Sequence, residues 1–226
     1  MPSLTGAIAS AAAKVAKVPS FFWMDSLPKT PTMETILADI RTENKGGGNC
    51  VGQFVVYDLP DRDCAAAASK GEYSIVGGGI VKYKNYIDTI RKIIPIYSDI
   101  RILLVIVTNL KVQKRANVKS AYLECINYAI IQLNLPNVAM YLTAGHAGWL
   151  GWSANQDPAA QLYAQAYKDT GSPSLFRSLV TNVANYNTWD IASAPSYTRG
   201  NAVYDEKLYV HALGPLLEKP RSGSIW

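Results

Sequence analysis

Short apolar runs that alternate with helix-patterned segments constrain the fold of this chain more than any other feature. Such runs, bounded by turn residues, are typical of strands buried on both faces. Strands alternating with helices indicate a parallel sheet, so the predicted fold class is α/β. The predicted strands are residues 21–24, 54–57, 101–107, 138–142 and 179–184.

The segments between these runs carry the start and stop signals of helices. An alanine-rich helix over 6–18 is predicted to end before Pro19. The next is predicted to begin with Thr30 as its N-cap and Pro31 in its first turn. The remaining predicted helices are 83–94, which Pro95 should kink or end, 118–133, one that opens at Asp157 and Pro158, and 203–217.

Length and charge exclude several classes of protein. The 226 residues fit one domain spanning 1–226. The net charge of +5 is scattered along the chain, which predicts no nucleic-acid partner. No apolar run approaches transmembrane length, so no membrane partner is predicted. Lys14 and Lys17 interrupt the alanine-rich segment, which therefore does not read as a signal peptide.

A cluster of charged residues directly after the run 54–57 is the first candidate site. Asp58, Asp61, Arg62 and Asp63 follow it, and Pro60 turns the chain between them. Functional groups in α/β proteins collect just beyond the carboxyl ends of strands. Two interpretations are open: an ion pair within the loop, in which Arg62 neutralises Asp61 or Asp63, or carboxylates placed for chemistry.

The segment YDLPDRDCAA, residues 57–66, resembles a signature of glycoside hydrolase family 6, which includes the fungal cellobiohydrolase II enzymes. VPSFFWMD, SAYLECINYAIIQLNLPNVAMYL, AGHAGWLGW, NQDPAAQL, TNVANYN and GNAVYDEKLYVHALGPLL extend this resemblance from about residue 12 to 217. It implies a distorted parallel β/α barrel, here incomplete because residues 218–226 cannot supply the remaining strands. It also implies an extracellular monomer without a cofactor that binds cellulose and cleaves β-1,4-glucosidic bonds with inversion, as a cellobiohydrolase.

The resemblance assigns catalytic roles to three residues. Asp63 matches the family's second carboxylate, which raises the pKa of the general acid because two nearby carboxylates do not easily both ionise. Tyr57 matches the tyrosine beneath the distorted sugar ring; the alternative is an ordinary strand tyrosine. Ser69 matches the loop serine that helps to place the attacking water.

Aromatic and polar side chains in the matching segments are the candidate substrate contacts. Tryptophan faces stack on sugar rings, although tryptophans are more often core residues, and His146 has a structural interpretation as well. With only two histidines and no ligand spacing, no metal is expected. The predicted substrate-binding residues are Trp23, Asp25, His146, Trp149, Trp152 and Asn185.

Three departures from the family pattern bear on activity. Ile106 is followed directly by Val107, where the family carries an EPDSL segment with its general acid, and Thr143 replaces an aspartate. The third expected departure is the family's C-terminal region, which carries further substrate contacts and a carboxylate near the attacking water. Separately, the family's disulfide partner of Cys64 is replaced by Arg115, and Cys125 is predicted to be a buried thiol. Little hydrolysis is therefore expected, and the alternative function is a non-catalytic glucan-binding protein.

Overall fold

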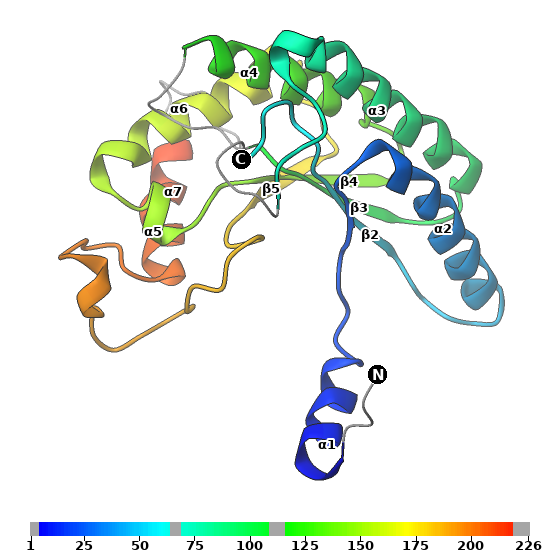
Figure 1. Cartoon of the computed structure of the whole chain (residues 1–226), viewed down its shortest axis with the longest axis horizontal. Helices are drawn as coiled ribbons and strands as arrows, with labels where there is room; N and C mark the ends of the chain where they lie inside the picture. Colours follow the sequence, from blue (N-terminus) through cyan, green and yellow to red (C-terminus); the bar gives the residue numbers. More distant parts are fainter. Residues whose placement is uncertain (1–4, 64–68, 109–115, 219–226) are drawn as a thin grey trace.

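The computed structural model describes residues 5–63, 69–108 and 116–218. Its centre is a parallel sheet of five strands in the order β1-β2-β3-β4-β5, so neighbours in sequence are neighbours in space (Figure 1). The predicted α/β class is confirmed. The strands are β1 (Phe22–Met24), β2 (Gly52–Val56), β3 (Ile102–Ile106), β4 (Val138–Thr143) and β5 (Phe176–Val180).

Helices between successive strands form an arch over one face of the sheet (Figure 1). These are α2 (Thr30–Lys45), α3 (Gly79–Ile93), α4 (Ala116–Gln132) and α6 (Ser153–Asp169). The short α5 (Ala147–Leu150) and α7 (Glu206–Leu217) pack beside α6. Four 3₁₀ turns complete the described elements: Leu27–Lys29, Ile75–Gly77, Ile94–Tyr97 and Ser196–Thr198.

The strands alternate their side chains between two apolar clusters of unequal size. Phe54 and Val56 of β2 face the helices and join the main core, whereas Val55 points to the other face. The same period of two runs through β3, where Val105 shares the second face with Val55. The strand register places Trp23, Val55, Val105 and Tyr141 in one row across that face.

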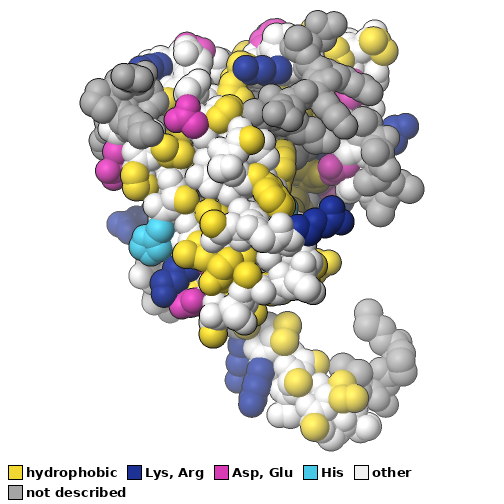
Figure 2. Space-filling model, turned by 90° about the vertical axis from the view of Figure 1, so that its left-hand side faces the viewer, with side chains coloured by type: hydrophobic (Ala, Val, Ile, Leu, Met, Phe, Trp, Pro, Cys, Tyr) yellow, Lys and Arg dark blue, Asp and Glu magenta, His cyan; other side chains and the backbone are white. Residues whose placement is uncertain are grey.

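The second face is covered less than the first. A cavity of about 290 Å³ lies against it, bordered by Phe21, Trp23, Val55, Val105 and Val180 among others. The N-terminal helix α1 (Gly6–Val15) buries none of its residues and stands apart from the rest of the chain (Figures 1 and 2). The described part of the sheet is thus open, in agreement with the predicted incomplete barrel.

Two predicted helix starts are wrong. A 3₁₀ turn runs straight into α2, so Thr30 is its first residue rather than its N-cap, and its hydroxyl donates to Leu27 O at 2.8 Å. The helix α6 begins at Ser153 and not at Asp157, because Trp152 O already accepts the first-turn N–H groups of Asn155 and Gln156.

Two other boundaries are shifted. The fifth strand runs from Phe176 to Val180 rather than over 179–184, and it ends there because the chain turns at Asn182 with a φ of 60°. The last helix begins at Glu206 rather than 203, since Asp205 caps it by accepting the Leu208 N–H at 2.8 Å. The end of α3 at Ile93, just before Pro95, is as predicted.

Cys125 is fully buried on α4, which confirms the predicted buried thiol, and Cys50 is a free, exposed cysteine. Cys64 and Arg115 lie outside the described residues, so the predicted loss of the family's disulfide stays a prediction. Within residues 5–63, 69–108 and 116–218, no helix combines the length and apolar character needed to cross a membrane.

Candidate active site

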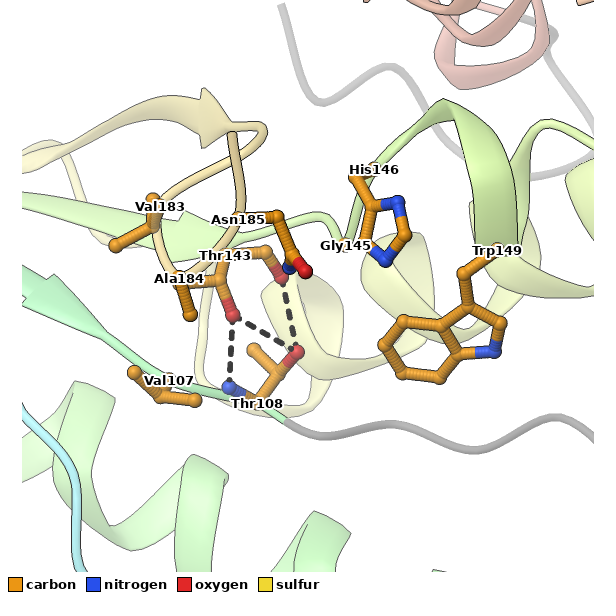
Figure 3. A pocket seen from close by; sticks show the side chains of 9 residues that line it. All are labelled: Val107, Thr108, Thr143, Gly145, His146, Trp149, Val183, Ala184 and Asn185. Carbon is orange, nitrogen blue, oxygen red and sulfur yellow. Dashed lines mark hydrogen bonds between the residues drawn. The ribbon is translucent and has the colours of Figure 1, made fainter. Parts of the chain in front are cut away.

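Two pockets lie beyond the carboxyl ends of the strands, where parallel strands bring their following loops together. The tyrosine pocket, about 440 Å³, follows β1 and β2. It is lined by Trp23, Asp25, Ser26, Lys29, Tyr57, Arg62, Ser69, Lys70 and Glu72. The histidine pocket, about 70 Å³, follows β3, β4 and β5 (Figure 3). It is lined by Val107, Thr108, Thr143, Gly145, His146, Trp149, Val183, Ala184 and Asn185.

Tyr57 is held between two side chains at the end of β2. The Trp23 ring meets it edge-on, with centroids 5.4 Å apart at 88°. The Arg62 guanidinium lies over the Tyr57 ring, with Cζ 4.2 Å from its centroid. The phenol donates a hydrogen bond to the Asp63 carboxylate. Burial, together with this bond and the Asp63 charge, raises the pKa of Tyr57 to about 12, so the phenol keeps its proton at neutral pH.

The loop after β2 folds back on itself to bring Asp63 to Tyr57. Asp61 and Asp63 both adopt the left-handed region, with φ of 55° and 47°. The Asp61 N–H donates to Tyr73 O at 2.8 Å, which anchors the turn. Left-handed residues other than glycine are uncommon and gather at functional sites. Asp63 does not itself line the tyrosine pocket and reaches it through the Tyr57 hydroxyl.

Arg62 pairs with Asp58, and not with Asp61 or Asp63 as the ion-pair interpretation proposed. Its Nε lies 3.5 Å from Asp58 Oδ1, and both side chains are buried. Its terminal nitrogens donate to the carbonyls of Asp25, at 2.7 Å, and Ser69. Because these carbonyls belong to the loops after β1 and β2, Arg62 joins the two walls of the tyrosine pocket.

The histidine pocket has neutral groups at the ends of β3 and β4. Thr108 N donates to Thr143 Oγ1 at 3.0 Å, and Thr108 Oγ1 donates to Thr143 O at 2.9 Å (Figure 3). His146 and Trp149 stand opposite this pair, with ring centroids 6.4 Å apart. Burial lowers the pKa of His146 more than the charge of Glu206 raises it. None of the described residues that line this pocket carries a carboxylate.

The predicted site residues thus fall into two groups. Trp23, Asp25, Tyr57 and Ser69 line the tyrosine pocket, and His146, Trp149 and Asn185 line the histidine pocket. Trp152 borders neither; it is 38% exposed, and its indole Nε1 donates to Gly148 O at 3.2 Å. The individual roles of these residues stay predictions.

Sequence reasoning missed several polar groups of the site. Glu72 lines the tyrosine pocket and accepts the Leu27 N–H at 2.8 Å, a contact across 45 positions that no local pattern announces. Asn187 and Glu206 bond to each other and reach the back of His146. They lie in TNVANYN and GNAVYDEKL, whose resemblance to the family was the available signal. Among the described residues, no group of three His, Cys, Asp or Glu side chains is arranged to hold a metal ion.

Comparison with known proteins places these observations in one family. Residues 2–224 match the family described as glycosyl hydrolases family 6. The chain is 72% identical over 225 residues to exoglucanase 2 of Hypocrea jecorina, covering 96% of this chain and 48% of that protein. It is 62% identical over 230 residues to 1,4-beta-D-glucan cellobiohydrolase C of Emericella nidulans, covering 96% of this chain and 50% of that protein. The chain therefore spans about half the length of the curated relatives it matches.

Solved structures agree with the sequence matches. The catalytic core domain of cellobiohydrolase Cel6A from Chaetomium thermophilum superposes with a TM-score of 0.90 at 55% identity, covering 99% of this chain and 65% of that one. Cellobiohydrolase II (Cel6A) from Humicola insolens, solved with glucose and cellotetraose, has a TM-score of 0.90 at 49% identity, with 99% and 65% covered. The parallel sheet, the tyrosine pocket at its carboxyl edge and these matches together show that the chain belongs to glycosyl hydrolase family 6.

Proposed function

We propose that this chain is a cellobiohydrolase-type, β-1,4-glucan-active protein that binds a glucan chain along the carboxyl edge of its sheet and hydrolyses it slowly, with inversion. The observation that carries the proposal is the Trp23–Tyr57–Asp63 arrangement at the end of β1 and β2. An aromatic face beside a phenol held by a carboxylate suits a neutral, polyhydroxylated ring. Relatives named exoglucanase and cellobiohydrolase give the substrate class.

Slow hydrolysis follows from the missing proton donor. Inverting cleavage needs a carboxylic acid to protonate the leaving oxygen and a carboxylate to activate water. Beyond β3 and β4, where the family resemblance expects carboxyl groups, the chain has Thr108 and Thr143 bonded to each other. Loss of a general acid lowers a rate by about 10²–10⁴-fold. We expect hydrolysis reduced by this order relative to a family member that has its acid.

A second candidate function is glucan binding without cleavage, and the neutral Thr108–Thr143 pair favours it. Neither function needs a metal or a cofactor. We also propose that residues 1–226 form part of one catalytic domain and act outside the cell as a monomer on cellulose, with neither nucleic acid nor membrane as a partner.

One experiment separates the two functions. The purified chain is incubated with cellulose and with a short soluble β-1,4-glucan, and both retention and released sugar are measured. Weak release that is abolished in Asp63→Ala supports hydrolysis, whereas retention without release supports binding alone. Asp39→Ala, which removes an exposed carboxyl of α2, is the matched control and should behave as the parent. Absence of retention and release in a cooperatively folded chain would reject both.

A further inference from the structure

The Nδ1 atom of His146 contacts Asn187, which in turn is bonded to Glu206, a residue from another segment of the chain. The Asn187 side-chain nitrogen lies 2.8 Å from His146 Nδ1 and 2.9 Å from Glu206 Oε1. Glu206 Oε1 also accepts the Ala147 N–H at 2.8 Å. Glu206 is only 2% exposed and is the first residue of α7. The three side chains therefore form one chain of contacts from the start of α7 to the pocket.

The chemistry of these groups orients the Asn187 amide. A carboxyl oxygen that already accepts the Ala147 N–H faces the Asn187 atom, so this atom must be a donor. The amide nitrogen has two N–H groups, one for Glu206 and one for His146, and no acceptor capacity. The opposite amide orientation would place an oxygen against Glu206 Oε1, so two acceptors would meet and the Glu206 bond would be lost. The contact with Glu206, and not the one with His146, therefore fixes the amide, since an Nδ1–H group would donate to an amide oxygen as well.

The loop that holds Asn187 is itself fixed. Asn187 N donates to Asn182 Oδ1 at 3.1 Å, and Asn182 Nδ2 donates to Asn187 O at 2.9 Å. Asn182 has a left-handed φ of 60°, and its N–H donates to Gly145 O at 2.8 Å. The amide is thus anchored to the segment that also bears His146.

These contacts decide where the imidazole carries its proton. Since Asn187 can only donate, Nδ1 must accept, and the proton of the neutral ring lies on Nε2. Figure 3 shows one ring nitrogen turned toward the space between Thr108 and Trp149, and the other turned away. We propose that Asn187 and Glu206 are positioning residues that fix His146 as the Nε2–H tautomer, so that the ring presents one N–H donor to the histidine pocket.

This inference rests on the proposed function only for its ligand, a neutral sugar oxygen, which suits a neutral N–H donor. Burial lowers the pKa of His146, in keeping with a ring that stays neutral. Glu206 is the one charged group that acts on the His146 pKa among the described residues. His146 therefore binds and orients, and it does not supply the proton that cleavage needs.

The test is the tautomer itself, observed in the free protein. The chain has two histidines, so imidazole ¹⁵N–¹H spectra contain two ring systems, and His211→Gln assigns them. We expect His146 to show the Nε2–H tautomer at neutral pH. Asn187→Asp keeps the side-chain shape but places a second carboxyl beside Glu206, and the two do not easily both ionise. The one proton they share lies between them, so the new oxygen that faces Nδ1 is left as an acceptor and we expect Nδ1 to gain a proton. Cellotetraose binding should weaken about two- to tenfold, as for one lost hydrogen bond.

Tyr186→Asp is the matched control, because it adds an aspartate to the same loop at a fully exposed side chain. It should leave the His146 tautomer unchanged. Glu206→Gln keeps a carbonyl acceptor for Asn187, so it should retain the tautomer and, by removing the charge, lower the His146 pKa further. An Nδ1–H tautomer in the parent, or an unchanged tautomer in Asn187→Asp, would overturn the inference. The correct tautomer without cellotetraose binding would instead count against the proposed function alone.

Discussion

Replacement of Asp58 by asparagine should remove a specific pH dependence of stability. Asp58 is fully buried directly after β2, and neither carboxyl oxygen has a hydrogen-bond partner among the described residues. Burial raises the pKa of Asp58 from 3.8 to about 8; the Glu72 carboxylate adds to this rise, and Arg62 opposes it. The folded protein therefore keeps a proton on Asp58 at pH values where the unfolded chain has released it.

The sign and size of the effect follow from proton linkage. Between the unfolded pKa of 3.8 and the folded pKa of about 8, the folded state binds one more proton, so stability falls as pH rises. The slope is about 1.4 kcal/mol per pH unit, and the full window corresponds to about 6 kcal/mol. This loss of stability from the ionisation of Asp58 is absent below the unfolded pKa and complete above the folded pKa.

Urea unfolding at about pH 5, 6 and 7 measures this slope directly. Asparagine has nearly the same shape and no charge, so the free energy of unfolding of Asp58→Asn, relative to the parent, should rise by about 1.4 kcal/mol per pH unit. Asp39→Asn, an exposed carboxyl of α2, should follow the parent. Parallel pH profiles for the parent and Asp58→Asn would refute the reasoning, because they would mean that Asp58 ionises alike in both states.

Two further substitutions test how the pockets are held together. Arg62→Met removes the charged donors to the Asp25 and Ser69 carbonyls and should lower the free energy of unfolding by about 3 kcal/mol in urea at neutral pH. A loss below about 1 kcal/mol would contradict the bridging role of Arg62. Thr143→Val removes the acceptor of the Thr108 N–H at nearly constant shape and should cost about 1–3 kcal/mol in the same assay, whereas Thr143→Ser should retain most of the stability.

The fold could be predicted from the sequence because its signals are local. The continuous apolar run 102–106 and the apolar side of α4 are set by neighbouring residues, and both elements formed where expected, within two residues. The predicted boundaries were wrong where a contact with a residue distant in sequence determined where an element ends. Val180 ends β5 because Asn182 turns the chain toward Gly145, a partner 37 positions away that no window around residue 180 contains.

The resemblance named the candidate site residues but not the contacts between them. Tyr57, Asp63 and His146 lie beyond the carboxyl ends of the strands, and their membership of the site and their roles stay predictions. The resemblance did not show that Arg62 turns to Asp58, since a loop with three carboxylates offers three partners. The Thr108–Thr143 bond likewise depends on the β3–β4 register, which a single sequence does not specify.

The proton-donating groups of the chain explain why binding should survive better than cleavage. Every Asp, Glu, His and Tyr lies within the described residues, so no candidate acid is hidden elsewhere in these 226 residues. Tyr57 reaches its pocket but holds its proton with a pKa of about 12, too tightly for efficient acid catalysis near neutral pH. Burial raises the pKa of Glu72, yet the Leu27 N–H and other hydrogen bonds outweigh it, so the net shift is downward and Glu72 ionises easily.

Asp58 has a suitable pKa but is not accessible to a substrate. Its pKa of about 8 would suit a general acid, but the side chain has no exposed surface and its Oδ1 lies 3.5 Å from Arg62 Nε. A pKa suited to acid catalysis thus belongs to Asp58, whereas access to the tyrosine pocket belongs to Tyr57 and Glu72. Catalysis by a general acid requires both in one group within hydrogen-bond reach of the leaving oxygen. Aromatic stacking and hydrogen bonding to sugar hydroxyls require neither, so the proposed glucan binding is compatible with the proposed slow cleavage.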